Sequence, residues 1–342
     1  MKTILVTGAG GYIGTELVAQ LLEEGHKVIG ADRFFFGKEL LGSSQTHPNF
    51  QLLQKDIRKL SAADFAGVDV VMDLAGLSND PTAELSQDLA WSINFDGGSN
   101  VAKAAKAAGV KRFIYSSSCS VYGTGKQLLL TEESELAPAT TYAQTKVRLE
   151  EELLKLQDQK FEVVILRNAT VYGYSSRMRF DLVINLMTLS AWRDGQIVIM
   201  GGGKQWRPVV HIGDVVEAFC ICINAPASAV AGEIFNVGSD EQNYQVFQLA
   251  YMIKSVFSGV KLITAPDDAD KRSYNVSFKK IHETLNYTAS RTPLSAAKEL
   301  KEALTMGKID IYDKRLNTLK HYQHLLEVQE TFSALAEDGK II

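Results

Sequence analysis

Hydrophobic and polar positions follow two alternating patterns in the first half of the chain. Short runs rich in β-branched and aliphatic residues predict strands at Thr3–Thr7, Lys27–Ala31, Val68–Leu74, Arg112–Ser116 and Glu162–Arg167. Amphipathic stretches between them predict helices, among them Gly14–Glu24, Leu85–Ala108 and Tyr142–Gln157. Alternation of this kind is typical of a parallel sheet that helices cover on both faces.

From about Tyr172 this alternation ends. Helical patterns follow at Arg179–Arg193, His211–Ala225, Val246–Val256 and from Lys298 onward, with short strands at Ile197–Met200 and Lys261–Thr264 around a turn at Gly201–Gly203. We therefore expect an α/β fold: a Rossmann-type doubly wound parallel sheet with a smaller C-terminal α/β substrate-binding lobe. The boundaries we expect are 1–172 for the Rossmann domain with 206–238 returning to it, 173–205 and 239–305 for the lobe, and 306–342 for a helical tail of no assigned function.

A glycine-rich turn directly follows the first strand and opens a helix. Glycines there permit a tight turn and let backbone N–H groups approach a pyrophosphate at the helix N-terminus. The sequence therefore predicts a dinucleotide site whose contacts include Gly8, Gly11, Tyr12, Ile13 and Gly14.

Asp32 ends the second strand, where a carboxylate accepts hydrogen bonds from the adenosine ribose and repels a 2′-phosphate. This position favours NAD over NADP, although the neighbouring Arg33 is a counter-signal because an arginine can accommodate that phosphate. Asp56 and Ile57 follow the third strand, where a side chain can meet the adenine; a solvated aspartate at a strand end is the alternative. The small residues of Leu74-Ala75-Gly76 would let backbone lie against the cofactor.

Tyr142 and Lys146 are four residues apart in a predicted helix and share one face. An ammonium held near a phenol favours the phenolate and lowers the tyrosine pKa, as a general base for a sugar or alcohol hydroxyl requires. A serine hydroxyl from the upstream Ser116–Ser118 run would orient the same substrate oxygen.

Composition narrows the class of protein. The 342 residues are 46% hydrophobic and 22% charged with a net charge of -4, so neither nucleic acid nor an anionic membrane is an expected partner. We also expect no membrane span, no signal peptide and no metal. The three cysteines, Cys119, Cys220 and Cys222, form no Cys-x-x-Cys motif, which is typical of a reduced cytoplasmic protein.

These motifs in this order resemble the extended short-chain dehydrogenase/reductases, the NAD-dependent nucleotide-sugar epimerase/dehydratase family. The resemblance covers roughly residues 1–305 and rests on the glycine turn, Asp32, Leu74–Gly76, Asn94, Ser116–Gly123, Tyr142 with Lys146, Arg167 with Tyr172-Gly173, Arg207–Asp214 and Phe235–Gly238.

The resemblance implies a role for each matching residue. Tyr142 is the expected catalytic acid/base, Ser118 the active hydroxyl, and Lys146 the residue that lowers the tyrosine pKa and binds the nicotinamide ribose. Asn94 belongs to the expected cofactor site. Arg207 matches the arginine that grips the substrate diphosphate, and Arg272, within Asp270–Tyr274, resembles a second phosphate contact. Cys119, Ser120, Thr170 and Arg179 complete the expected substrate contacts, whereas His211 and Asp214 match structural positions.

Departures from the family pattern bear on the reaction. Dehydratases of the family place an acidic pair just after the serine or threonine, where this chain has Cys119 and Ser120, which disfavours dehydration. Some relatives use a cysteine of this loop as an acid/base, but Cys119 is one residue away from that position, and a small buried residue is the alternative. Many carbon-4 epimerases carry an asparagine where Thr170 stands. Arg177 and Arg179 resemble a sugar-dehydrogenase subgroup; they could clamp a diphosphate or lie in a solvated loop.

We therefore expect NAD-dependent oxidoreduction at carbon 4 of a nucleotide-diphosphate sugar, as a dehydrogenase or ketoreductase. A 4-epimerase with tightly bound NAD is the alternative, followed by a non-catalytic NAD-binding protein of the same fold and a reductase of unactivated carbonyls. The helices predicted at Leu85–Ala108 and Tyr142–Gln157 correspond to those that family members pair into a dimer interface, so we expect a homodimer.

Overall fold

The computed structural model describes residues 1–123, 129–266, 272–337 and 340. Its centre is a seven-stranded sheet in the order β10-β6-β5-β4-β1-β2-β3, in which every neighbouring pair is parallel. The strands are β1 Thr3–Thr7, β2 Lys27–Asp32, β3 Phe50–Gln54, β4 Val70–Asp73, β5 Arg112–Ser118, β6 Glu162–Asn168 and β10 Glu233–Val237. The predicted Rossmann-type sheet is confirmed.

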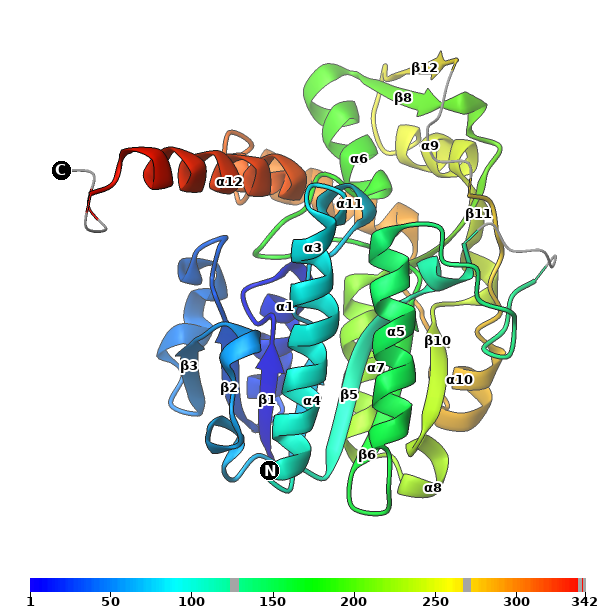
Figure 1. Ribbon diagram of the computed structural model, residues 1–342. Helices are drawn as coiled ribbons and strands as arrows, with labels where there is room; N and C mark the ends of the chain where they lie inside the picture. The colour runs from blue at the N-terminus through cyan, green and yellow to red at the C-terminus, as the bar shows by residue number, and fades with distance from the viewer. Residues whose placement is uncertain (124–128, 267–271, 338–339, 341–342) are drawn as a thin grey trace.

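Helices cover both faces of this sheet, and the strand sequences show why. Along β1, Ile4 and Val6 pack in one apolar cluster with α1 (Tyr12–Glu23) and α7 (Ile212–Asn224). The intervening Leu5 packs in a second cluster with α4 (Gly98–Ala107) and α5 (Thr141–Leu156), the two helices in front of the sheet in Figure 1. Since neighbouring residues of a strand face opposite sides, both must be apolar when both faces are buried.

The helix predicted over Leu85–Ala108 is interrupted in the structure. A short α2 (Asp80–Ala83) and α3 (Gln87–Ala90) precede a π-helical stretch, η4 (Trp91–Gly97), which continues directly into α4. Wide π turns shift the side chains that follow them relative to a regular helix.

Two smaller sheets lie beyond the carboxyl ends of the large one. The first contains β7 (Thr170–Tyr172), β9 (Trp206–His211) and β11 (Asn243–Gln245); the second pairs β8 (Gln196–Met200) with β12 (Lys261–Ala265) in parallel. They pack with α6 (Val183–Asp194), α9 (Val246–Lys254) and α11 (Pro293–Thr305). The helix predicted from Arg179 begins only at Val183, which leaves Arg179 in a loop.

The remaining elements are short, apart from α12. They are η1 Lys38–Thr46, η2 Ile57–Lys59, η3 Ala62–Phe65, η5 Cys119–Tyr122, η6 Gly201–Gly203, α8 Ala227–Val230, η7 Asp240–Gln242, α10 Lys279–Leu285, η8 Lys314–Leu316 and α12 Thr318–Leu335. In Figure 1, α12 extends away from the body of the molecule on the side of β2 and β3. Within the described ranges, none of the helices combines the length and apolar character of a membrane span.

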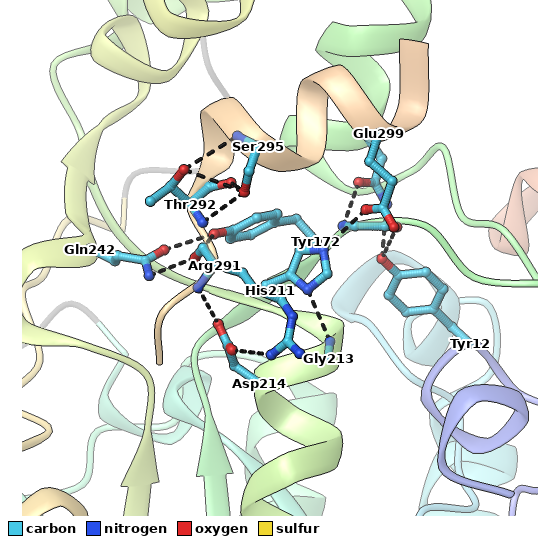
Figure 2. A network of polar contacts seen from close by, with 12 residues as sticks. Tyr12, Tyr172, His211, Gly213, Asp214, Gln242, Arg291, Thr292, Ser295 and Glu299 are labelled. Carbon is cyan, nitrogen blue, oxygen red and sulfur yellow. Dashed lines mark hydrogen bonds and ion pairs between the residues drawn. The ribbon is translucent and has the colours of Figure 1, made fainter. Parts of the chain in front are cut away.

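A polar network ties the first turn of α7 to the segment before α11 (Figure 2). The Asp214 carboxylate accepts from Arg291 Nη1 at 2.5 Å and from the Arg291 backbone N at 3.1 Å. His211 Nδ1 accepts from the Gly213 backbone N at 3.0 Å, and its Nε2 lies 3.3 Å from Glu299. These contacts agree with the structural roles expected for His211 and Asp214.

Candidate active site

A cavity of about 890 Å³ opens at the carboxyl ends of β1, β4 and β5, between the large sheet and the smaller ones. The chain runs outward from β1 to β2 and β3 on one side and through β4, β5 and β6 on the other, so the cavity lies at the topological switch point. Every residue predicted for the site lines the cavity except Asn94.

The glycine turn is packed too closely for side chains. Gly8 has a φ of +68°, and a Cβ there would lie 2.9 Å from the Ala75 backbone N. A Cβ on Gly14 would lie 2.0 Å from the Gly8 carbonyl oxygen. Thr7 Oγ1 fixes the facing backbone by accepting from Leu74 N and Ala75 N, each at 3.2 Å. The turn therefore presents backbone N–H groups at the start of α1, as a pyrophosphate site requires.

Asp32 ends β2 beside this turn. Its carboxylate accepts from Gly10 N at 3.0 Å and from Phe34 N at 2.6 Å, and burial raises its pKa. The neighbouring Arg33 forms an ion pair with Asp56, with 3.1 Å between Arg33 Nη1 and Asp56 Oδ2. Arg58 bonds the same carboxylate at 2.6 Å, and the two arginines hold the Asp56 pKa well below its usual range. The arginine that could accommodate a 2′-phosphate is thus already paired, which fits NAD.

Asn94 is not among the residues that line the cavity, and its predicted contact with the cofactor stays a prediction. Its Oδ1 accepts from Leu77 N at 2.7 Å, and its Nδ2 donates to Leu77 O and to Thr145 Oγ1, both at 3.2 Å. Asn94 therefore pins the loop after β4 to α5 and positions the cavity wall indirectly.

Ser118 and Tyr142 meet at the carboxyl end of β5. Ser118 is the last residue of that strand, and Tyr142 lies in the first turn of α5, where the Thr140 side chain caps the helix by accepting from Ala143 N at 3.2 Å. The Ser118 hydroxyl is close enough to Tyr142 to lower the pKa of its phenol, against the stronger effect of burial. Lys146 Nζ lies 5.6 Å from the Tyr142 ring centroid and donates to the Ser116 carbonyl at 2.8 Å.

The expected lowering of the Tyr142 pKa is not found. Burial, with a contribution from the Asp80 carboxylate, raises the pKa of Tyr142 to about 12 despite the opposing effects of Ser118, Arg179 and Arg272. Burial also lowers the pKa of Lys146 to about 8. The ammonium is bonded to a carbonyl and not to the phenol, so the resting tyrosine is protonated.

The predicted substrate contacts line the far side of the cavity. Arg207 Nη1 donates to the carbonyl of Trp206 at 2.9 Å and also to that of Arg272. Arg272 Nη1 lies 2.9 Å from Asp80 Oδ2. Thr170 enters from β7. Asp270 and Lys271 of the quoted motif lie outside the described residues.

Of the two alternatives for Arg177 and Arg179, a diphosphate clamp or a solvated loop, the solvated loop is wrong, because both side chains are buried and have different partners. Arg179 pairs with Asp181 through two bonds of 3.1 and 2.7 Å and donates to Ser78 Oγ at 3.1 Å. Arg177 instead lies over the Phe36 ring, 3.6 Å from its centroid. Arg179 therefore lines the cavity with its charge already compensated.

Cys119 supports the serine loop. Its thiol is buried and donates to the Arg167 carbonyl at 3.2 Å, and burial raises its pKa. Those contacts favour the supporting role over acid/base duty. Ser120 differs, because its Oγ is buried at the cavity without a hydrogen-bond partner among the described residues.

One wall of the cavity consists of residues that the sequence did not predict for the site. Phe35 and Phe36 line it after Asp32, and Asn317, Leu319 and Tyr322 line it from the C-terminal segment. The one available signal was the apolar Phe34-Phe35-Phe36 run, which is unusual for an exposed loop.

A glycine turn at the switch point beside a Ser-Tyr-Lys set defines a dinucleotide-dependent enzyme of the short-chain dehydrogenase/reductase class. Residues 4–238 match the model of the NAD-dependent epimerase/dehydratase family. The chain belongs to that family, whose members are enzymes with NAD as cofactor.

Relatives within the family catalyse different reactions. The chain is 32% identical to a UDP-N-acetyl-α-D-glucosaminuronate decarboxylase of Bacillus cytotoxicus, over 70% of this chain and 76% of that protein. It is equally identical to a UDP-glucose 4-epimerase of Mycolicibacterium smegmatis, over 70% and 77%. An uncharacterized protein of Sinorhizobium fredii is also 32% identical over 78% of this chain, which spans only 63% of that relative.

Solved structures share the fold at lower identity. A UDP-glucose 4-epimerase of Thermotoga maritima gives a TM-score of 0.80 at 23% identity, covering 90% of this chain and all of the other. A dTDP-glucose 4,6-dehydratase of Streptomyces venezuelae gives the same score and identity, with 90% and 98% covered. At these identities the likeness shows the α/β fold alone.

Proposed function

We propose that this chain catalyses NAD-dependent oxidoreduction at carbon 4 of a nucleotide-diphosphate sugar, with Tyr142 as the acid/base. The observation that carries the proposal is that Ser118, Tyr142 and Lys146 line one cavity, with the Lys146 ammonium 5.6 Å from the Tyr142 ring centroid. The same cavity is lined by the glycine turn, by Arg207 of β9 and by Arg272, whose carbonyl accepts from Arg207. We assign the cofactor to the glycine turn and the substrate diphosphate to the two arginines.

The residues present fit NAD, because the glycine turn excludes side chains and the Asp32 carboxylate lines the adjoining wall. When bound, NAD exchanges a hydride with a carbinol carbon. Tyr142 would exchange the proton of the substrate hydroxyl, and Ser118 would orient that oxygen. Lys146, held by the Ser116 carbonyl, would supply positive charge beside the phenol.

The net reaction we favour is that of a dehydrogenase or ketoreductase. A phenol with a pKa of about 12 is protonated at neutral pH and can donate to the oxygen of a keto sugar. The second candidate is a 4-epimerase. It is supported by the C-terminal segment, which lines the cofactor end of the cavity and would retain NAD between half-reactions, and by the similarity to the M. smegmatis UDP-glucose 4-epimerase. Neither of the two residues directly after Ser118, Cys119 and Ser120, is a carboxylic acid, which argues against dehydration.

The test is to incubate the protein and NAD with UDP-glucose, UDP-N-acetylglucosamine, GDP-mannose and dTDP-glucose, and to follow reduced nicotinamide by absorbance and the sugar by NMR. A dehydrogenase accumulates reduced cofactor together with an oxidised sugar. An epimerase interconverts carbon-4 epimers without accumulating reduced cofactor. If NAD binds and none of the sugars changes, the non-catalytic NAD-binding protein becomes the better account.

The diphosphate contact has its own test. Arg207→Ala combined with Arg272→Ala should weaken binding of UDP while leaving NAD affinity unchanged, because we assign the two arginines to the substrate diphosphate. Equal UDP affinity in the wild type and the double variant would favour a reductase of unactivated carbonyls instead.

The proposal also includes a homodimeric state and a cytoplasmic location. We infer a homodimer in which α4 and α5 meet their counterparts. The three cysteines are all free thiols, which supports a cytoplasmic location.

A further inference from the structure

Arg177 is a buried cation with few polar partners. It lies in the loop between β7 and α6, and only 3% of its surface is exposed. Nη2 donates to Thr318 Oγ1 at 3.0 Å, and Nη1 makes a long contact of 3.5 Å to the Met178 carbonyl. Nε has no hydrogen-bond partner among the described residues, although the side chain lines the cavity.

The loop that carries Arg177 is fastened to the first turns of α1. Ser175 Oγ accepts from Arg177 N at 3.2 Å and donates to the Tyr12 carbonyl at 2.8 Å. The next backbone N–H, that of Ser176, donates to Glu16 at 2.9 Å. Because α1 begins directly after the glycine turn, Arg177 lies beside the helix N-terminus that a pyrophosphate would approach.

Among the residues that the structure describes, no carboxylate forms an ion pair with Arg177. Burial, with repulsion from Arg179, lowers the pKa of the Arg177 guanidinium to about 9. The nearby carboxylates are committed elsewhere: Asp181 pairs with Arg179, and Asp32 accepts from two backbone N–H groups. A buried guanidinium without a paired carboxylate is costly, and a bound phosphate removes that cost.

We propose that Arg177 is a cofactor-binding residue whose guanidinium pairs with the pyrophosphate of the dinucleotide. The inference rests on the NAD site and not on the carbon-4 chemistry. The substrate diphosphate is assigned to Arg207 and Arg272.

The C-terminal segment holds this cation in place. Thr318 bonds the guanidinium directly, and the Leu316 carbonyl accepts from Phe180 N at 2.9 Å. His321 Nε2 lies 2.8 Å from the Phe35 carbonyl, and the Tyr322 ring packs edge-on against Phe36 with 5.5 Å between centroids. The guanidinium thus contacts both the Phe36 ring and Thr318, the first residue of α12.

The experiment compares the wild type with Arg177→Met by calorimetric titration with NAD, ADP, adenosine and UDP. We expect NAD and ADP to bind about tenfold to a hundredfold more weakly to the variant, with adenosine and UDP unchanged, because only NAD and ADP place a diphosphate at the α1 N-terminus. The matched control, Arg193→Met, removes an exposed arginine that is paired with Asp194 and should bind all four ligands like the wild type.

Three results would overturn the proposal. Equal weakening of adenosine and NAD would make Arg177 purely structural, and loss of UDP binding alone would assign it to the substrate. In a further titration with NADP, tighter binding of NADP than of NAD by the wild type, lost in the variant, would assign Arg177 to a 2′-phosphate. If Arg177→Met does not fold, Thr318→Val serves instead: it removes one hydrogen bond from the guanidinium and should weaken NAD severalfold while sparing adenosine. Unchanged NAD affinity in that variant counts against the proposal.

Discussion

At the scale of single residues, two hydroxyls meet where β5 ends and α5 begins. Ser118 and Tyr142 both line the cavity there, and Lys146 lies one helical turn along α5, with its ammonium donating to the Ser116 carbonyl at 2.8 Å. Tyr115 provides a second aromatic ring near the same ammonium, 4.7 Å from its centroid. Proton exchange is assigned to Tyr142 because its hydroxyl lies in the cavity, whereas the Tyr115 hydroxyl is buried without a partner among the described residues.

The first prediction removes that hydroxyl. Tyr142→Phe should lower turnover of the responsive nucleotide sugar by about 10²–10⁴-fold, the usual contribution of a positioned acid/base, with NAD affinity unchanged. Tyr115→Phe is the matched control, since it removes a hydroxyl near the same lysine and should leave turnover intact. Steady-state kinetics on both variants checks this, and equal turnover in Tyr142→Phe and wild type would exclude the assigned role.

The second prediction concerns Asp73, the last residue of β4. Its Oδ1 accepts from Thr7 Oγ1 at 2.5 Å, and burial raises the pKa of the carboxyl from 3.8 to about 6. Between these pH values the folded protein keeps a proton that the unfolded chain releases, so stability falls as the pH rises through this window. Above pH 6 the whole penalty for a buried carboxylate is present.

Asp73→Asn removes this penalty and keeps an oxygen acceptor for Thr7. The unfolding free energy of the variant relative to wild type should therefore rise between about pH 4 and 6, by up to about 3 kcal/mol at about 1.4 kcal/mol per pKa unit. Denaturant unfolding across that pH range measures this free energy. A difference between variant and wild type that does not change with pH would show that the pKa of the Asp73 carboxyl is not raised in the folded state.

At the scale of elements, a buried ion pair sets the position of α5. Glu150 on this helix accepts from Arg167 Nη2 on β6 at 2.7 Å and from Ser117 Oγ on β5 at 2.5 Å. Both partners are almost fully buried, with 3% of each side chain exposed. The ion pair ties the helix of Tyr142 to β6, and the Ser117 hydrogen bond ties the same helix to β5, the strand of Ser118.

Glu150→Gln should destabilise the fold by about 3–5 kcal/mol, because it leaves the Arg167 charge buried without its carboxylate. Glu151→Gln, one residue along and paired with Arg148 at the surface, should cost less than about 1 kcal/mol. Thermal or denaturant unfolding of the two variants compares them directly. Similar losses in both would mean that the buried pair does not hold α5.

The elements that the sequence predicted are those with strong local patterns. β1 matches its predicted bounds, and α5 begins and ends within one residue of its prediction, because each shows its own apolar periodicity. β7 and β9 were missed, since strands of three and six residues are defined by pairing with distant segments. The break in Leu85–Ala108 was missed because π turns have no clear apolar period.

At the scale of the whole molecule, the cavity joins segments from both ends of the chain. The glycine turn, Asp32 and the Ser-Tyr-Lys set were predicted because each lies in a local motif. The contact of His321 with Phe35 was not predicted, because the two residues are 286 positions apart in the chain and neither belongs to a recognisable motif. The prediction of a lowered pKa for Tyr142 was wrong for a related reason: the burial of Tyr142 beside Asp80 depends on the complete fold.

The proposed dimer is tested on the outer face of α5. Leu154 is exposed to 37% on that helix, so Leu154→Asp should convert a dimer to a monomer by placing a charge in an apolar contact. Leu294→Asp on α11, exposed to 36%, should leave the dimer intact. Light scattering gives the masses, and a wild-type monomer, or a dimer insensitive to Leu154→Asp, would exclude this interface.

The most direct test follows the hydrogen atom on carbon 4. The protein, loaded with NAD, is mixed with UDP-glucose, GDP-mannose and dTDP-glucose that carry deuterium at that carbon, and the nicotinamide is recovered for mass spectrometry. The account predicts deuterium on the reduced cofactor with at least one of these sugars, and none with Tyr142→Phe. Reduced cofactor without deuterium, or the same transfer with Tyr142→Phe, would contradict it.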